Sequence, residues 1–321
     1  MNKPYAFGRQ QRSGPVIKPS KPRFDAACLI NAGTRSSQQD AVLLSAPDGE
    51  DIALMILADG MGGHLGGEIA SQVALTAAFA ETMLQLVRYR AGRTLVPQAL
   101  RSAIEKANAA VADHVASDPD LKGMGTTLVI CVQAGPDLYW ASVGDSPLYV
   151  YRDATLKRLN EDHSMGPQID AMVLTGMIKA EEAATHPQRH QLVSAICGSR
   201  VSQIDCPTAP FRMQTGDRLI LSSDGLQTLS DDEISRILRK YRRSDSHEVC
   251  HALMDAIVAA ADPDQDNVAI AMSRLLSDTP LDIRSFADGA DAAPTAFGKS
   301  RFPDDPDVEE ASDLLNQALL L

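Results

Sequence analysis

Four aspartates stand where a short apolar run meets a glycine or a polar turn. Carboxylate and carbonyl oxygens are the ligands that hard divalent cations such as Mg²⁺ and Mn²⁺ prefer. Strand ends that converge would hold such ligands on a rigid frame, and a glycine lets the chain turn sharply and bring a carbonyl oxygen to a cation. The pattern therefore indicates a divalent-cation site, and its candidate ligands are Asp59 with the carbonyl of Gly60, Asp145, Asp224 and Asp266.

A simpler interpretation exists for each aspartate taken alone. Asp-Gly is a favoured turn dipeptide, so one such pair more often marks a turn than a metal ligand. Here the residues recur at the ends of apolar runs from position 59 to position 266. That recurrence favours the site over the turn.

The elements that must position these residues follow from the hydrophobic pattern. Short apolar runs bounded by Gly, Asp or Pro predict strands. Apolar residues spaced three and four apart predict three helices. The second opens at Pro97. The apolar residues of the first are Leu75, Phe79, Met83 and Leu86, and those of the late one are Val249, Leu253 and Ile257. The predicted strands cover 26–32, 41–45, 52–58, 127–132, 138–143, 148–151, 218–222 and 268–272.

The order of these elements indicates the fold class. Strands come first, then two long helices, more strands, an irregular to helical insertion over 164–191, and finally a strand, a helix and a strand. A chain of this kind fits an α+β fold, in which two mostly antiparallel sheets are flanked by helices, better than an alternating βαβ chain.

Composition shifts divide the chain into three parts. Residues 1–22 are basic, rich in Pro and Gly and poor in apolar side chains, which is typical of a flexible leader. Residues 23–277 hold all the predicted elements and form the folded domain. Residues 278–321 are acidic and proline-containing, and we expect a linker followed by a short amphipathic segment with Leu314, Leu315 and Leu319 on one side.

Charge and cysteine usage exclude several function classes. The formal net charge is −12 and the pI is near 5.0, which argues against nucleic acid as the main partner. No apolar stretch approaches the roughly 20 residues of a membrane span, and no secretory signal is visible. The five cysteines are scattered without a CxxC pair, so we expect reduced thiols in a cytoplasmic protein.

Seven short motifs in order make the sequence resemble the metal-dependent protein phosphatase family of type 2C, particularly its bacterial members. The most specific is Asp-Gly-Met-Gly-Gly-His at 59–64, which matches the bacterial form without a change. The others are Arg-Ser-Ser-Gln-Gln-Asp at 35–40, Gly-Met-Gly-Thr-Thr at 123–127, Val-Gly-Asp-Ser at 143–146, Asp-His-Ser at 162–164, Ser-Asp-Gly-Leu at 223–226 and Asp-Asn at 266–267. The resemblance implies a four-layer α-β-β-α sandwich.

The resemblance also implies roles for individual residues. Asp59 would bridge two metal ions, Mn²⁺ or Mg²⁺, with the Gly60 carbonyl on one of them. Asp224 and Asp266 would hold the other. Such a pair, roughly 3.5–4 Å apart, acidifies a bridging water that attacks phosphorus directly. Asp40 would orient a metal-bound water from behind the ligands, and Arg35 would clamp the substrate phosphate with its planar fork of donors.

Some positions depart from the family pattern. Gln39 replaces a glutamate that contacts a metal through water, so one cation would be held more weakly. Met61 stands where animal members have a candidate general-acid histidine, and His64 is the substitute that we predict, unless it merely caps a helix. Pro147 replaces an arginine, and Asp145 could hold a third metal with fewer partners than usual.

Two further histidines invite a catalytic interpretation. For His163 we favour a structural one, because the Asp-His-Ser turn can be held by side-chain bonds to the backbone. His186 lies in the insertion that would form the family's flap over the substrate, and its role is open.

These observations predict a serine/threonine protein phosphatase that acts on a phosphorylated protein, such as a bacterial serine/threonine kinase or its targets, and that works as a monomer. Two alternatives stay open at this point. One is a catalytically weak, phospho-dependent binding module of the same fold, and the other is an enzyme acting on a small phosphoester. Intact Asp59, Asp224 and Asp266 favour an active enzyme.

Overall fold

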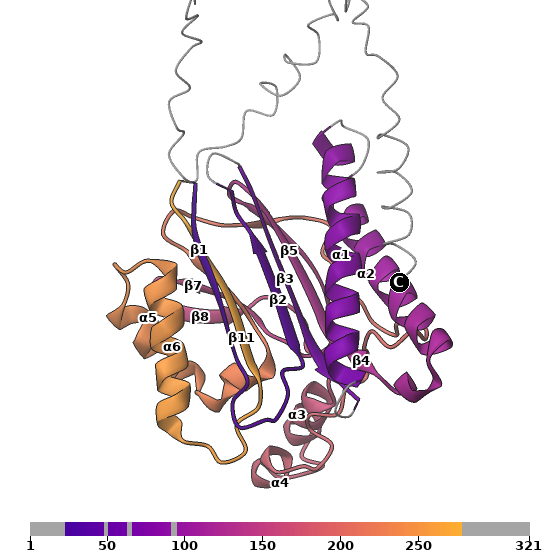
Figure 1. Ribbon diagram of the computed structural model, residues 1–321. Helices are drawn as coiled ribbons and strands as arrows, with labels where there is room; N and C mark the ends of the chain where they lie inside the picture. Colours follow the sequence, from indigo (N-terminus) through magenta and orange to yellow (C-terminus); the bar gives the residue numbers. More distant parts are fainter. Residues whose placement is uncertain (1–22, 48–50, 63–65, 91–94, 278–321) are drawn as a thin grey trace, which may run out of the picture. The chain divides into compact units, whose positions relative to one another are not determined.

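The computed structural model describes residues 23–47, 51–62, 66–90 and 95–277 (Figure 1). The chain divides into two units, Met1–Leu281 and Asp282–Leu321, and every described residue belongs to the first. The predicted basic leader, the acidic C-terminal stretch and His64 therefore lie outside the described residues.

Two antiparallel sheets form the centre of the fold. The five-stranded sheet has the order β1 (Phe24–Asn31), β11 (Val268–Leu275), β10 (Arg218–Ser222), β7 (Leu148–Arg152) and β8 (Thr155–Arg158). The six-stranded sheet runs β2 (Asp40–Ser45), β3 (Ile52–Met61), β5 (Leu128–Ala134), β6 (Asp137–Val143) and β9 (Phe211–Arg212), with β4 (Gly125–Thr126) joined to β3.

Helices cover the outer face of each sheet, as Figure 1 shows. Helices α1 (Gly66–Arg90) and α2 (Val96–Ser117) pack on the six-stranded sheet, while α5 (Asp231–Lys240) and α6 (Ser246–Ala260) pack on the five-stranded one. Alternate strand residues point inward between the sheets and form a third core, which includes Leu57, Val129, Leu221 and Ala271. The predicted α-β-β-α sandwich is confirmed.

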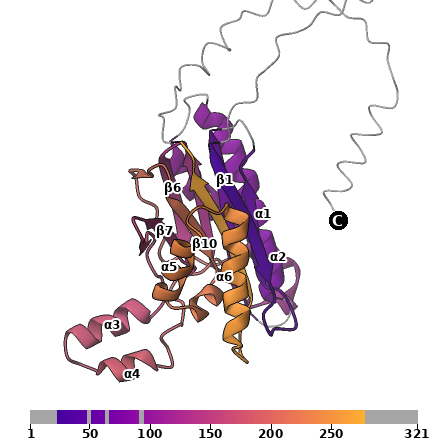
Figure 2. The ribbon, with the colours of Figure 1, turned by 90° about the vertical axis from the view of Figure 1, so that its left-hand side faces the viewer.

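The insertion that follows β8 in the chain carries two helices, α3 (Gly166–Leu174) and α4 (Ala180–Ala184). Figure 2 shows that they extend away from the two sheets. The short 3₁₀ helices η1 (Pro119–Leu121) and η2 (Asp224–Thr228) complete the elements. None of the helices in the described ranges is long and apolar enough to cross a membrane.

The first long helix differs from its predicted packing. Met83, expected on the buried side, is 42% exposed, and Leu75 and Phe79 are only partly buried. The fully buried line of α1 is instead made by Ala70, Ala74 and Ala78. Small side chains let α1 approach both α2 and strand β3 closely. The alanine side of the helix therefore faces inward, although the spacing of the large apolar residues does not predict it.

Helix α5 is missing from the predicted element order, although its start carries a recognisable signal. Ser230 Oγ accepts a hydrogen bond from the Glu233 backbone N–H, and the Glu233 carboxylate accepts one from the Ser230 backbone N–H, which is a capping box. The Ser-x-x-Glu spacing could have predicted this helix from the sequence.

Candidate active site

Chain segments that are far apart in the sequence meet at one cavity of about 470 Å³. The loop between β1 and β2, the end of β3, the turn between β6 and β7, the start of η2 and the start of β11 all contribute to it. The lining residues are Arg35, Ser36, Ser37, Gln39, Asp59, Gly60, Met61, Gly62, Thr127, Asp145, His190, Leu192, Asp224, Asp266 and Asn267. Four aspartates predicted as metal ligands, together with Gly60, are thus brought to one place.

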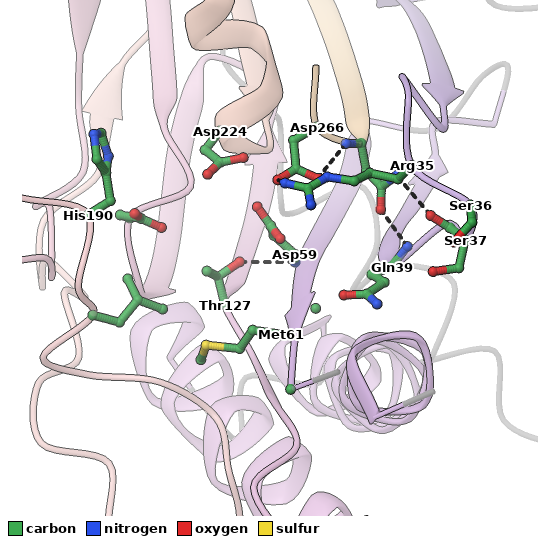
Figure 3. Close-up of a pocket in the computed structure, with 15 residues that line it drawn as sticks. Arg35, Ser36, Ser37, Gln39, Asp59, Met61, Thr127, His190, Asp224 and Asp266 are labelled. Carbon is green, nitrogen blue, oxygen red and sulfur yellow. Dashed lines mark hydrogen bonds and ion pairs between the residues drawn. The ribbon is translucent and has the colours of Figure 1, made fainter. Parts of the chain in front are cut away.

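Asp59 lies near the end of β3 and is fixed through its backbone (Figure 3). Its N–H donates to Thr127 Oγ1 at 3.0 Å, and its carbonyl accepts from Thr127 N and Thr126 Oγ1, both at 2.8 Å. The Thr-Thr pair of the sequence motif therefore positions the backbone of the central aspartate. Burial, followed by the charges of Asp40, Asp224 and Asp145, raises the pKa of Asp59 well above its usual range.

Gly60 is a position where only glycine fits. A Cβ there would lie 2.1 Å from the carbonyl oxygen of Gly67 and 2.6 Å from that of Gln39. The close approach brings β3, the start of α1 and the Gln39 segment together beside the cavity, which explains the Asp-Gly pair better than a turn does.

Asp145 lines the same cavity from the turn between β6 and β7. Burial raises its pKa to about 7, with further contributions from the nearby charges of Asp224 and Asp162. Its backbone carbonyl accepts from Arg158 Nη2 at 2.7 Å, and Arg158 Nη1 also reaches Asp162. Arg158, from β8, thus fixes the backbone of the turn that carries Asp145.

Asp224 and Asp266 approach the cavity from η2 and the start of β11. Burial, and then the charge of Asp266, raises the pKa of Asp224, while His190 and Arg35 act in the opposite direction. Asp266 accepts a hydrogen bond from Arg35 Nη2 at 2.7 Å. Figure 3 shows Arg35 and His190 on opposite sides of these aspartates.

Asp40 lies behind the cavity and does not line it. It is directly opposite Asp59 in the β2–β3 pair, is only 6% exposed, and accepts from Ser223 Oγ at 2.7 Å. Burial raises its pKa to about 7, with added repulsion from Asp224 and Asp266. Like charges directly opposite on neighbouring strands destabilise a sheet, so this arrangement serves something other than stability.

The donor set fits hard divalent cations. Carboxyl groups gather at the cavity, and burial and their mutual repulsion raise the pKa values of Asp59, Asp145 and Asp224 despite the nearby Arg35. A bound cation would stabilise their ionised forms. Within the described ranges, no group of three or more His, Cys, Asp or Glu side chains is already arranged to hold a metal ion. Mg²⁺-type ions do not require one, because one or two carboxylates with several waters suffice.

The histidines divide into three cases. The predicted general acid His64 is outside the described residues, so its role stays a prediction. His163 is buried, accepts from the Gly144 N–H at Nδ1, and has a pKa lowered by burial, which fits the structural interpretation. His186 is not among the residues that line the cavity, whereas His190, which the sequence reasoning missed, is.

Comparison with known proteins now decides the family. The sequence model described as protein phosphatase 2C matches residues 31–257. The chain belongs to the protein phosphatase 2C family. That membership accounts for the order of the seven motifs and for the two-sheet fold that brings them to one cavity.

Several bacterial members of the protein phosphatase 2C family are similar to this chain. The serine/threonine protein phosphatase PstP of Mycobacterium tuberculosis is 35% identical over 238 residues, which is 74% of this chain and 42% of the relative. The serine/threonine phosphatase stp of Listeria welshimeri is 33% identical over 68% of this chain and 83% of the relative. The chain therefore spans less than half the length of the mycobacterial relative.

Solved structures of the family agree with the fold. A crystal structure of the M. tuberculosis phosphatase PstP/Ppp has a TM-score of 0.64 at 31% identity, covering 79% of this chain and 99% of that one. The catalytic domain of PstP in complex with two manganese ions has a TM-score of 0.62 at 30% identity, with 79% and 99% covered.

Asn267, the second residue of the family's last motif, joins the Arg35 loop to β11. Its Oδ1 accepts from Gln39 N at 2.8 Å, and its Nδ2 donates to the carbonyls of Ala32 at 2.8 Å and Ser37 at 3.0 Å. It is only 5% exposed. One side chain thus makes three hydrogen bonds to the loop that carries Arg35, a supporting role that the motif at 266–267 did not report.

We expect Asn267→Ala to destabilise the fold by about 1–3 kcal/mol, because buried partners lose their hydrogen bonds, and to raise KM for a phosphopeptide, because the Arg35 loop loosens. The matched control is Asn108→Ala, which also removes three hydrogen bonds to loop backbone, at Cys197, Gly198 and Ser199. Urea unfolding measures the loss of stability, and steady-state kinetics measure the change in KM. An equal rise in KM in both variants would show that Asn267 has no specific link to the site.

Proposed function

We propose that this protein is a serine/threonine protein phosphatase that hydrolyses phosphoserine or phosphothreonine in a partner protein with the aid of two divalent cations. The observation that carries the proposal is the meeting of four aspartates and Arg35, from five separate segments, at one cavity. A fold alone does not imply an activity, but this residue set provides both cation ligands and a phosphate-binding group.

The aspartates at the cavity would hold the cations. Asp59 and the Gly60 carbonyl would hold one cation, and Asp59 with Asp224 and Asp266 the other, while Asp145 is the candidate ligand for a third. When bound, such cations supply an acidified water and positive charge for the phosphoryl oxygens. Manganese or magnesium suits the oxygen donors, and manganese is the ion in the PstP complex.

Asp40 would act through its neighbours rather than on the substrate. Its hydrogen bond from Ser223, beside Asp224, and its position opposite Asp59 place it against two of the proposed ligands. We therefore retain the prediction that it orients a water bound at the ligands, from the layer behind them.

Arg35 would bind the substrate phosphate. Its side chain is 55% exposed, lies at the cavity and holds only one oxygen of Asp266 through Nη2. A guanidinium carries five N–H donors in a plane, so phosphate can be bound at the remaining donors. The leaving serine or threonine oxygen then needs a proton, from a water or from a histidine such as the predicted His64.

A protein substrate is proposed on two grounds. Two relatives that match this chain are named serine/threonine phosphatases, and His190 of the insertion lines the cavity. A bacterial serine/threonine kinase or its targets would be the physiological partner. The cytoplasmic location also belongs to this proposal, supported by the free thiols of all five cysteines.

The test is hydrolysis of a phosphothreonine peptide and of p-nitrophenyl phosphate by the purified chain, with Mn²⁺ or Mg²⁺ and then with EDTA. We expect activity with either ion, loss with EDTA and recovery when Mn²⁺ is returned. Calorimetric Mn²⁺ binding provides a readout that does not depend on turnover. Full activity in metal-free buffer would contradict the two-cation chemistry, and Mn²⁺ and phosphopeptide binding without turnover would favour the binding-module alternative.

The tails give a separate prediction. A chain of residues 23–277 should fold and hydrolyse p-nitrophenyl phosphate at the rate of the full chain, because both sheets, their helices and the described cavity lie within it. If the tails recognise a partner protein, only activity towards that protein should fall. The measurements are circular dichroism, thermal unfolding and kinetics on both substrates. Loss of the folded state would show that a tail is part of the core.

A further inference from the structure

Two histidines lie side by side on the exposed side of α6, on the outer face of the five-stranded sheet. His247 and His251 are four residues apart, which places them one turn apart on the same helix face. Their Nε2 atoms are 3.2 Å apart, and their ring centroids are 4.4 Å apart at an interplanar angle of 63°. Both side chains are exposed.

The backbone beneath this pair is firmly held. The opposite side of α6 contributes Val249, Cys250, Leu253 and Ile257 to the core that covers the five-stranded sheet. Asp245 caps the helix by accepting from Glu248 N at 2.8 Å. The spacing of the two histidines is therefore set by a packed helix, so a ligand held between them would not have to order the backbone first.

The distance between the two nitrogens matches a shared metal ion. Zinc lies about 2.0–2.1 Å from a histidine nitrogen, so two nitrogens at a tetrahedral angle on one zinc are about 3.3 Å apart. In the neutral pair, one Nε2–H donates to the other Nε2. A metal ion would take the place of that proton, which would move to the Nδ1 of the same ring, since each ring has two tautomers.

We propose that His247 and His251 form a two-imidazole binding site for a transition-metal ion of the zinc class. Imidazole favours Zn²⁺, Ni²⁺ and Cu²⁺, whereas the carboxylate cavity favours Mg²⁺ and Mn²⁺. The two sites therefore select different ions. This inference does not depend on the proposed phosphatase activity.

Nearby charges and the number of available ligands determine how the two histidines would bind a metal ion. The start of a helix carries partial positive charge, which disfavours a cation, but Asp245 and Glu248 next to the pair are acidic and offset it. Within the described ranges no third His, Cys, Asp or Glu side chain completes a metal-binding group there. Water would fill the other coordination positions, so the site is open and its metal exchangeable.

The experiment is calorimetric titration of the full chain with ZnCl₂ in the presence of millimolar Mg²⁺, which competes at the carboxylate cavity. His247→Ala and His251→Ala are the test variants, and His114→Ala is the matched control, because His114 is an exposed histidine on another helix, α2. Loss of a supporting residue around a metal typically costs 10–100-fold in affinity, so loss of a ligand should weaken zinc binding at this site by at least about tenfold. The control should bind zinc as the unaltered chain does.

A second measurement locates the ion. In the nitrogen–proton NMR spectrum of the imidazole side chains, zinc should shift the signals of His247 and His251 and leave those of His114 unchanged. Circular dichroism should show that all variants stay folded, because the three side chains are exposed. Equal zinc affinity in the unaltered chain and both test variants, or unshifted His247 and His251 signals at saturating zinc, would overturn the proposal.

Discussion

Asp59→Asn is expected to lower kcat by about 10³-fold or more at saturating Mn²⁺. The substitution keeps the size of the side chain and removes its charge, and cations stabilise a phosphoryl-transfer transition state by several kcal/mol, where each 1.36 kcal/mol is tenfold in rate. Asp224→Asn should behave in the same way. Steady-state kinetics on p-nitrophenyl phosphate and calorimetric Mn²⁺ binding are the measurements.

The same substitution should not weaken the metal-free fold. Burial and the charge of Asp40, which lies directly opposite in the β2–β3 pair, raise the pKa of Asp59, so the metal-free fold disfavours a charge at this position and an amide removes it. We expect an unchanged or higher Tm in EDTA, in line with the trade-off between stability and activity at functional sites. Asp113→Asn, at an exposed position of α2, is the matched control and should alter neither quantity. A large fall in Tm with normal Mn²⁺ binding would show that Asp59 is a structural residue.

Arg35→Ala is expected to lower kcat/KM for a phosphopeptide by about 10–150-fold, chiefly through KM. A hydrogen bond to a charged group contributes about 1.5–3 kcal/mol, and Arg35 would supply such bonds to the phosphate. Arg35→Lys should recover part of the loss, because it keeps the charge but not the planar fork.

Mn²⁺ binding separates this role from that of a metal ligand. Arg35 Nη2 holds an oxygen of Asp266 at 2.7 Å, so its removal frees a carboxylate for a cation. Apparent Mn²⁺ affinity should therefore stay the same or increase in Arg35→Ala, in contrast to Asp59→Asn. An unchanged kcat/KM would show that the phosphate is bound by other residues.

Local sequence identified the aspartates that line the cavity and the strands that carry them. Asp59 and Gly60 at the end of an apolar run, and Asp224 at the end of another, were predicted together with the strands that support them, because strand periodicity and glycine's small size are local properties. The five cysteines were also predicted to be reduced, because they are odd in number and scattered without a CxxC pair, and all five thiols are free.

Tertiary structure decided which residues reach the cavity and which remain behind it. The family resemblance implied that Asp40 lies behind the ligands, and the β2–β3 register provides the physical arrangement, in which Asp40 is buried and Asp59 lines the cavity. Strand register is set by pairing between distant segments, so no short motif reports it.

His190 and Asn267 show the same limit. His190 reaches the cavity through the path of the insertion after α4, and His186, four residues earlier, does not line it. Asn267 fixes the Arg35 loop over a separation of more than 220 residues. The sequence by itself thus determined the chemistry of the site, through residue types and local turns. Long-range strand pairing and side-chain contacts decided which residues line the cavity and which residues support them.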